Sequence, residues 1–323
     1  MRRREFIGLV GAAAAWPCAG LAQRPTKPAV VGFLVPGTPT SFSQRLAASV
    51  KRLGELGWID GRTITIEYRW AEAQRFDEIA AELVRLKVDV IFTTGTPPVI
   101  ALRKLTSEIP IVFVAAGDPV GTGLVVSLAR PGANITGLSN QSADIVKKRL
   151  GLLREMVPNL SKLAVMAKID NISAAKEMRE VQTVAAALGM QPIMLEVREA
   201  DDITAAFAGL AERADALYVV PDSLVTTNAL RIGALALGAR LPTIHGAREL
   251  VQAGGLMSYG ANYPALYRRA AEYIDKILRG AKPARMPIEQ PTQFDLVINL
   301  STAKELSLSI SPSLIARADD VIE

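Results

Sequence analysis

The stretch Val-Asp-Val-Ile-Phe-Thr-Thr-Gly-Thr-Pro at residues 88–97 decides the fold. Its apolar, β-branched half stops abruptly at Thr, Gly and Pro, which predicts a buried parallel strand that ends in a loop at the carboxyl edge of a sheet. Before it, Ile79, Leu83 and Leu86 fall at i, i+4 and i+7, the spacing of one helix face. The unit is therefore helix, strand and polar loop.

The same unit returns later in the chain, as Ala-Asp-Ala-Leu-Tyr-Val-Val-Pro-Asp-Ser at residues 214–223. In this alignment Asp89 matches Asp215, and Thr96 matches Asp222. Strand and helix patterns alternate in the same order around both copies, which is typical of parallel sheets covered by helices. The sequence therefore predicts an α/β protein with two doubly wound parallel-sheet lobes that face one cleft.

The C-terminal remainder, residues 263–323, does not make a third lobe and is expected to return and complete the two sheets. Several crossings of the chain between the lobes would then act as a hinge. The expected lobes are residues 28–140 plus 261–288 for the N-terminal lobe and residues 141–260 plus 289–323 for the C-terminal lobe.

Residues 1–22 are predicted to be an export signal. Three arginines precede an apolar stretch at residues 6–16 and a small-residue cleavage site, and this stretch is shorter than the roughly 20 residues of a membrane-spanning helix. Residues 3–7, Arg-Arg-Glu-Phe-Ile, resemble the twin-arginine signal. An ordinary Sec signal and a lipid anchor at Cys18 are the alternatives. In each case the protein is expected in the periplasm.

Composition argues against several classes of protein. Half of the residues are hydrophobic and 21% are charged, as in a globular chain. The net charge is +5, partly from the export signal, and no basic run interleaved with aromatics follows it, so we expect no nucleic acid partner. The single cysteine, Cys18, lies in the signal, which leaves the body of the protein without disulfides.

The usual motifs of enzymes are missing. With one histidine in the chain, no zinc-binding HExxH helix and no histidine-rich metal cluster can form. There is no Gly-x-Ser-x-Gly elbow, no phosphate loop and no dinucleotide fingerprint. We therefore expect a binding protein without metal or cofactor, although an unrecognised α/β enzyme is a remaining alternative.

Ligands of open parallel sheets bind beyond the carboxyl ends of the strands, which selects a set of loop residues. Thr94, Gly95 and Thr96 offer hydroxyls and a helix N-terminus suited to a carboxylate, and Thr96 could also cap that helix. Asp222 and Asp118 are candidates for a ligand ammonium group, with Asx turns as the alternative role. The remaining candidate ligand contacts are Thr38, Asn171, Ser223, His245 and Tyr259.

Three aromatic or titratable candidates have structural alternatives. His245 ends a strand expected to point at the cleft, but a lone histidine can equally be a packed or capping residue. Tyr259 lies at a predicted crossover, where it could contact ligand or pack in the hinge. Trp70 could stack on a ligand ring, but covering the edge of the lobe is the favoured interpretation.

Nine motifs, in order along residues 29–323, resemble the ABC-transporter substrate-binding family that includes tryptophan- and tyrosine-binding members. They are residues 57–62, 66–72, 80–84, 109–114, 117–119, 127–132, 254–260, 289–294 and 312–319. The resemblance implies the type I periplasmic binding fold and an exported receptor that closes on a small ligand and delivers it to a membrane permease.

We therefore expect a monomeric solute-binding protein of an ABC importer, with an amino acid, aromatic or branched, as its ligand. A sensor subunit that signals to a membrane receptor would differ only in its partner. A LacI-type repressor shares the fold, but this chain has a signal peptide where the repressor needs a helix-turn-helix.

Overall fold

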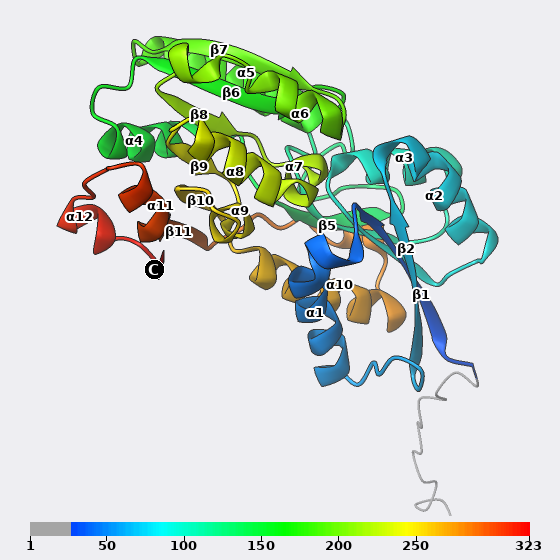
Figure 1. The fold of residues 1–323 in the computed structure, drawn as a ribbon. Helices are drawn as coiled ribbons and strands as arrows, with labels where there is room; N and C mark the ends of the chain where they lie inside the picture. Colours follow the sequence, from blue (N-terminus) through cyan, green and yellow to red (C-terminus); the bar gives the residue numbers. More distant parts are fainter. Residues whose placement is uncertain (1–26) are drawn as a thin grey trace, which may run out of the picture.

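The computed structural model describes residues 27–323, and the predicted export signal lies outside them. The described chain forms two lobes, each built on its own sheet (Figure 1). The five strands of the first sheet are parallel and have the order β2-β1-β3-β4-β5. They are β1 (Ala29–Pro36), β2 (Ile64–Ala71), β3 (Val90–Thr94), β4 (Ile111–Ala116) and β5 (Ile135–Ser139).

Helices cover both faces of the first sheet, as the predicted alternation requires. On one face α2 and α3 pack against Leu34 and Ile91, and on the other α1 and α10 pack against Phe33 and Phe92. Alternate residues of each strand thus enter opposite cores. The bounds are α1 (Pro39–Glu55), η1 (Ala73–Arg75), α2 (Phe76–Arg85), α3 (Thr96–Leu105), α10 (Tyr263–Leu278) and η3 (Pro283–Arg285).

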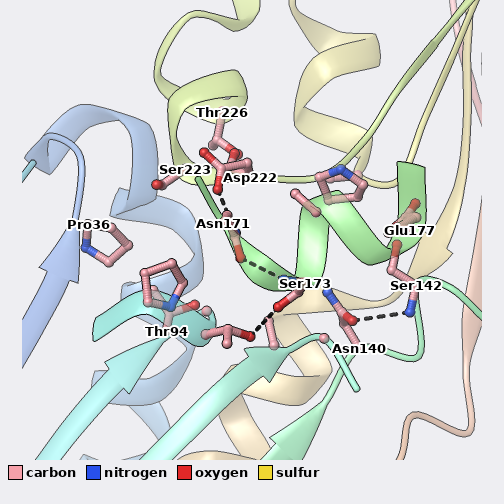
Figure 2. A pocket seen from close by; sticks show the side chains of 18 of the residues that line it. Pro36, Thr94, Asn140, Ser142, Asn171, Ser173, Glu177, Asp222, Ser223 and Thr226 are labelled. Atoms are coloured by element: carbon pink, nitrogen blue, oxygen red, sulfur yellow. Dashed lines mark hydrogen bonds between the residues drawn. The ribbon is translucent and has the colours of Figure 1, made fainter. Parts of the chain in front are cut away.

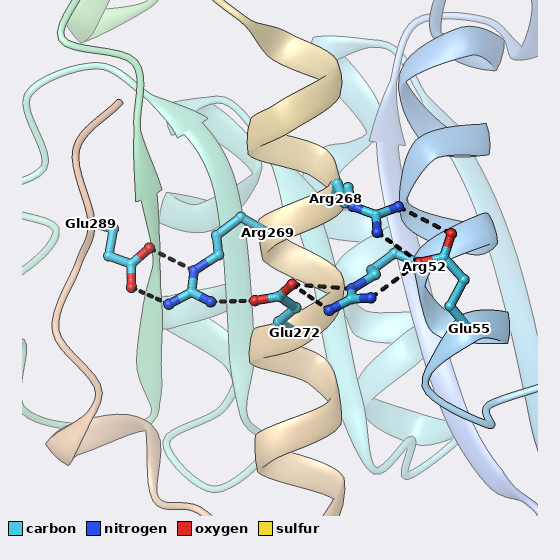
Figure 3. Close-up of polar contacts among 6 residues, drawn as sticks. All are labelled: Arg52, Glu55, Arg268, Arg269, Glu272 and Glu289. Carbon is cyan, nitrogen blue, oxygen red and sulfur yellow. Dashed lines mark hydrogen bonds and ion pairs between the residues drawn. The ribbon is translucent and has the colours of Figure 1, made fainter. Parts of the chain in front are cut away.

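The helix α10 comes from late in the chain but belongs to the first lobe, where ion pairs join it to α1 and to the crossover segment that follows η3 (Figure 3). Glu289 of that segment also pairs with β5 through its backbone, at 2.9 Å to Ser139 N and 3.1 Å to Gly137 O. The crossover is therefore held against the first lobe from two sides. The paired side chains are Arg268–Glu55, Arg52–Glu55, Arg52–Glu272, Arg269–Glu272 and Arg269–Glu289.

The second sheet has seven strands in the order β12-β11-β10-β9-β8-β6-β7. All neighbours pair in parallel except β10 and β11, which are antiparallel. The chain leaves β10 for α10 and returns by the crossover beside the hinge, so it enters β11 from the end at which β10 stops. The strands are β6 (Lys162–Lys168), β7 (Gln191–Val197), β8 (Ala216–Val219), β9 (Thr243–His245), β10 (Met257–Ala261), β11 (Phe294–Asn299) and β12 (Asp320–Ile322).

The helices of the second lobe also divide between the two faces of the sheet: α4, α5, α11 and α12 cover one face, and α6 to α9 cover the other. Residues 223–238 form two helices, α7 and α8, which are separated at Asn228. The bounds are α4 (Val146–Met156), α5 (Ile172–Ala187), α6 (Ala200–Ala206), η2 (Leu210–Glu212), α7 (Ser223–Thr227), α8 (Ala229–Gly238), α9 (Arg248–Gln252), α11 (Leu300–Glu305) and α12 (Pro312–Ile315).

The two repeated stretches hold equivalent places in their sheets. Asp89 precedes β3, and its carboxylate accepts a hydrogen bond of 2.7 Å from the backbone N–H of Val30 at the start of β1. Asp215 precedes β8, and its carboxylate accepts bonds from the N–H groups of Ser161 and Lys162, at the start of β6. Each aspartate aligns the central strand with its neighbour, and each strand then ends at the cleft.

Candidate ligand-binding cleft

A cleft lies between the lobes, at the carboxyl ends of the central strands of both sheets, and Figure 2 shows its polar centre. Its volume is about 850 Å³ when the space open to solvent is included. Apolar side chains form much of its wall and could receive the body of a small organic ligand. They include Pro36, Phe42, Phe76, Pro97, Pro221 and Leu250.

The first lobe brings the end of β3 into the cleft. Gly95 joins β3 to α3 with φ of +79°, a left-handed conformation that glycine adopts without steric cost. The Thr94 hydroxyl is already engaged, because it accepts a hydrogen bond of 2.8 Å from Tyr267 Oη. Thr96 is the first residue of α3, and the prolines at 97 and 98 have no N–H. Thr96 therefore provides both the hydroxyl and the backbone donor that this helix N-terminus offers to an anion.

The second lobe contributes the N-terminal ends of α5 and α7 to the cleft. Asn171 caps α5, with Oδ1 accepting a bond of 3.0 Å from Ser173 N, and its Nδ2 donates a bond of 2.8 Å to Asp222 Oδ2. Asp222 caps α7 through Oδ1, which accepts a 2.7 Å bond from Leu224 N. Burial raises the pKa of Asp222 in spite of these hydrogen bonds, which makes the site favourable for a cation that would restore the charge balance.

Two ion pairs connect the lobes across the cleft. Arg45 of α1 binds both carboxylate oxygens of Glu249 on α9, at 2.6 and 2.8 Å, and its guanidinium lies 3.9 Å from the ring centre of Tyr263. Burial alone would raise the pKa of Glu249, but Arg45 brings it below its ordinary value. Asp118, in the loop after β4, pairs with Lys176 of α5. These bonds hold the lobes in contact.

The remaining charges of the cleft differ in their partners. Glu177 of α5 forms a buried ion pair of 2.7 Å with Arg149. Asp222 is the one acidic side chain among the described cleft-lining residues that has no ion-pair partner. The cleft thus presents one uncompensated negative charge from the second lobe and, facing it, the N-terminus of α3 from the first.

The lobes also touch at the centre of the cleft. Thr96 Oγ1 lies 2.5 Å from Ser173 Oγ of α5, so the two hydroxyls share a hydrogen bond across the interface (Figure 2). Gly117 approaches Ser173 so closely that a Cβ at 117 would stand 2.9 Å from the serine Cβ. The described lobes are therefore in a closed arrangement.

Seven of the ten residues predicted to contact ligand come together in this cleft. The carboxyl ends of β3 and β4 and the loops after them supply four of them, and the facing lobe supplies the other three, as the open-sheet rule anticipates. They are Thr94, Gly95, Thr96, Asp118, Asn171, Asp222 and Ser223.

Thr38 lies outside the cleft. Its side chain forms a capping box with Ser41 at the start of α1, which satisfies the free N–H groups of that helix. It lines a second groove between the lobes, beside Thr227 and Asn228.

His245 and Tyr259 also lie away from the cleft wall, contrary to the prediction. His245 is buried, with Nε2 2.9 Å from Thr243 Oγ1, while Nδ1 has no partner. Burial and the nearby Arg149 lower its pKa to about 3, so the ring is neutral at physiological pH. The Tyr259 ring stacks on Phe294, at 5.9 Å between ring centres. Gly255 covers the imidazole, and Tyr259 packs against the core of the second lobe.

Several residues of the cleft were not predicted from sequence. Arg45, Ser173 and Glu177 are charged or polar residues on helices, where such side chains usually face solvent. A signal was present on α5, since Ser173 and Glu177 are separated by one turn and share a face with Ala174. Only the packing of α5 along the cleft distinguishes this stripe from an exposed helix face.

Two α/β lobes around a polar cleft form the type I periplasmic binding fold. The chain belongs to the ABC transporter substrate binding protein family, whose profile matches residues 43–322. A related tyrosine-binding protein of Clostridioides difficile (strain R20291) is 26% identical over 261 residues, which cover 80% of this chain and 75% of the relative.

Two solved structures of substrate-binding proteins are similar to this chain. An ABC domain from Streptococcus pneumonia in complex with L-Trp is 23% identical and has a TM-score of 0.86, covering 92% of this chain and 100% of that chain. A ligand-free, open substrate-binding protein with adhesive properties from Clostridium difficile is 26% identical and has a TM-score of 0.66, covering 91% and 99%.

None of the helices in residues 27–323 has the length and apolar character needed to cross a membrane. The same residues contain no group of three or more His, Cys, Asp or Glu side chains suited to hold a metal ion.

Proposed function

We propose that this protein binds a free amino acid with an aromatic or branched side chain and delivers it to an ABC permease. One observation carries the proposal: the cleft opposes a helix N-terminus with the Thr96 hydroxyl, from one lobe, to the unpaired carboxylate of Asp222, from the other. An amino acid carries the two matching charges on one carbon atom.

Each end of the zwitterion has a chemical partner. The ligand carboxylate would accept hydrogen bonds from Thr96 and gain from the dipole of α3. The ammonium would donate to Asp222 in a charge-assisted hydrogen bond. The apolar wall that includes Phe42 and Pro221 would then receive the side chain, and relatives named for tyrosine and L-Trp support an aromatic one.

The same proposal includes the route and partners of the protein. A twin-arginine-like signal at residues 1–22 would export the chain to the periplasm, where it would act as a monomer. Ligand bound between both lobes would stabilise the closed form, which the permease recognises. Uptake of labelled ligand into proteoliposomes that carry the permease, with and without the binding protein, tests the delivery step.

Calorimetry on ligand-stripped mature protein tests the binding step. Aromatic and branched L-amino acids are expected to bind, and analogues that lack either the carboxylate or the amine are expected to bind far more weakly. Thr96→Val should reduce the advantage conferred by the carboxylate, and Asp222→Asn the advantage conferred by the amine. Asp77→Asn, on the exposed side of α2, is the matched control. The absence of binding by every amino acid would refute the proposal.

If both cleft variants bind like the control, the ligand lies elsewhere and our placement of the site is wrong. A thermal-shift panel run beforehand identifies which amino acids to use, because a ligand that binds the native state raises its melting temperature.

A further inference from the structure

Glu177 is a second carboxylate in the cleft, and its two oxygens have different surroundings. The residue is 4% exposed. Oε1 accepts two hydrogen bonds, of 2.7 Å from Arg149 Nη1 and of 2.8 Å from Tyr218 Oη. Both donors belong to the second lobe, so this side of the carboxylate is fixed by its own lobe.

Oε2 of Glu177 has no hydrogen-bond partner among the described residues. It is also not sealed inside the protein, since His245 Nδ1 is the one buried side-chain atom without a partner in residues 27–323. Glu177 lines the cleft, so Oε2 is reached from there. The structure therefore holds a buried side chain with one free acceptor that opens into the ligand space.

This acceptor lies at the opposite end of the cleft from Asp222. Asn171, which holds Asp222, and Glu177 are six residues apart on α5, a rise of about 9 Å along the helix. Figure 2 shows Glu177 beside Ser142, and Asp222 beside Asn171. A ligand anchored at Asp222 would have to extend along α5 to reach Oε2.

The two carboxylates differ in whether a cationic side chain pairs with them. Asp222 lacks a cationic partner, whereas Glu177 is neutralised by Arg149. A neutralised carboxylate that keeps a free oxygen needs a hydrogen-bond donor but no additional cation. A phenol O–H or an indole N–H provides this donor at the far end of an amino acid.

On the basis of the proposed function, we infer that Glu177 Oε2 accepts a hydrogen bond from the side chain of the ligand, and that the site selects aromatic amino acids which carry a donor. Leucine or phenylalanine would leave the buried oxygen unpaired after water is displaced, and an unpaired buried acceptor is costly. Glu177 thereby becomes a specificity-determining residue.

Glu177→Gln tests the inference because the existing donors orient the new amide. Arg149 and Tyr218 both need an acceptor, so the amide oxygen takes the place of Oε1 and the NH₂ group points into the cleft. The acceptor that faces the ligand becomes a donor. Indole N–H cannot accept a hydrogen bond, so we expect the affinity for L-Trp to fall about ten- to hundredfold, with little change for L-Phe.

Calorimetry with matched ligands reads out the effect within each variant, and the wild-type protein provides a test of its own. Wild-type protein should prefer L-Tyr to L-Phe and L-Trp to 1-methyl-L-Trp. Asp77→Asn, on the exposed side of α2, is the matched control for the loss of one carboxylate, and it should keep the wild-type preferences.

The outcomes separate this inference from the proposed function. Wild-type protein that binds no amino acid overturns both. Binding without preference for donor-bearing side chains overturns the inference alone. An equal loss for L-Trp and L-Phe in Glu177→Gln also overturns it, because Glu177 would then act on the common backbone of the ligand.

Discussion

Replacing Gly117 by alanine is expected to weaken ligand binding by obstructing closure of the lobes. A Cβ at this position would stand 2.9 Å from Cβ of Ser173 in the other lobe. Because the serine Cβ is attached directly to the backbone of α5, no rotation of its side chain relieves the overlap. Carbon atoms pack at about 3.5–4.0 Å, so the lobes would have to part by roughly 0.6 Å or more at this point.

The cost of the substitution falls on the closed state. Gly117 does not have a left-handed φ, so alanine is compatible with its backbone, and the only close contact comes from Ser173. Overpacking of this kind costs about 1–3 kcal/mol, which corresponds to an affinity about 5- to 150-fold weaker. The same displacement would stretch the 2.5 Å hydrogen bond between Thr96 and Ser173.

Calorimetry gives the affinity, and small-angle scattering with saturating ligand gives the degree of closure. Gly151→Ala on α4 is the control, since its Cβ would meet nothing within 4 Å. In the Ser173→Gly background the penalty of Gly117→Ala should largely vanish, which a double-mutant cycle measures. Wild-type affinity in Gly117→Ala, or an equal penalty in both backgrounds, would refute the steric argument.

Three further predictions concern the ion pair between Arg45 and Glu249, the acidic residue Asp222 of the cleft, and Gly137 in the first sheet. Arg45→Met removes the ion pair with Glu249 and should open the ligand-free protein in scattering experiments, and a variant as compact as wild type would contradict this expectation. Acidification should open the wild-type protein too. The pKa of Glu249 lies below its ordinary 4.5, so the pair persists above pH 4.5 and is lost as the pH falls through the lowered value. Because burial raises the pKa of Asp222, amino acid affinity should decline on acidification at a higher pH than for an exposed aspartate, and calorimetry on Asp222→Asn should show no such step. Gly137→Ala should prevent folding or lower the free energy of unfolding by more than about 3 kcal/mol, as chemical denaturation would measure. The φ of Gly137 is +151°, and a Cβ there would stand 2.0 Å from Phe113 O. A stability close to wild type would exclude that clash.

The prediction of two doubly wound lobes is confirmed because it rests on signals local to the chain. The apolar run that begins at residue 88 and its copy at residue 214 became β3 and β8, central strands of the two sheets. The exception is β11, whose antiparallel direction depends on where the crossover enters the sheet. No local pattern carries that information. The assignment of residues to lobes stays a prediction.

The residues of the candidate site also differ in whether a local sequence pattern or a distant partner determines their place. Thr96 and Asp222 follow directly from strand ends, so the sheet rule finds them. His245 also follows a strand end, but β9 is three residues long and Gly255 of a neighbouring segment packs against the imidazole, with a hypothetical Cβ 2.5 Å from Nε2. Glu177 depends on Arg149 and Tyr218, which come from other elements. Partners distant in sequence decide which polar residues are exposed, buried or free.

Some contacts of the closed form need no ligand, whereas a bound ligand would replace another. The Arg45–Glu249 and Asp118–Lys176 pairs join the lobes directly and need no ligand. Thr96 and Ser173 also bond to each other, so the carboxylate of the proposed ligand would compete with a bond between the lobes.

A ligand shifts the equilibrium only by the difference in its affinity for the two forms. Thr96 and Asp222 belong to different lobes, so an amino acid could engage both only when the cleft is closed. Its carboxylate and ammonium together therefore have to contribute more than the Thr96–Ser173 bond that is lost. Under the proposed function, an analogue with one of the two charges would engage a single lobe and would not stabilise the closed form, so two charges would suit this cleft better than one.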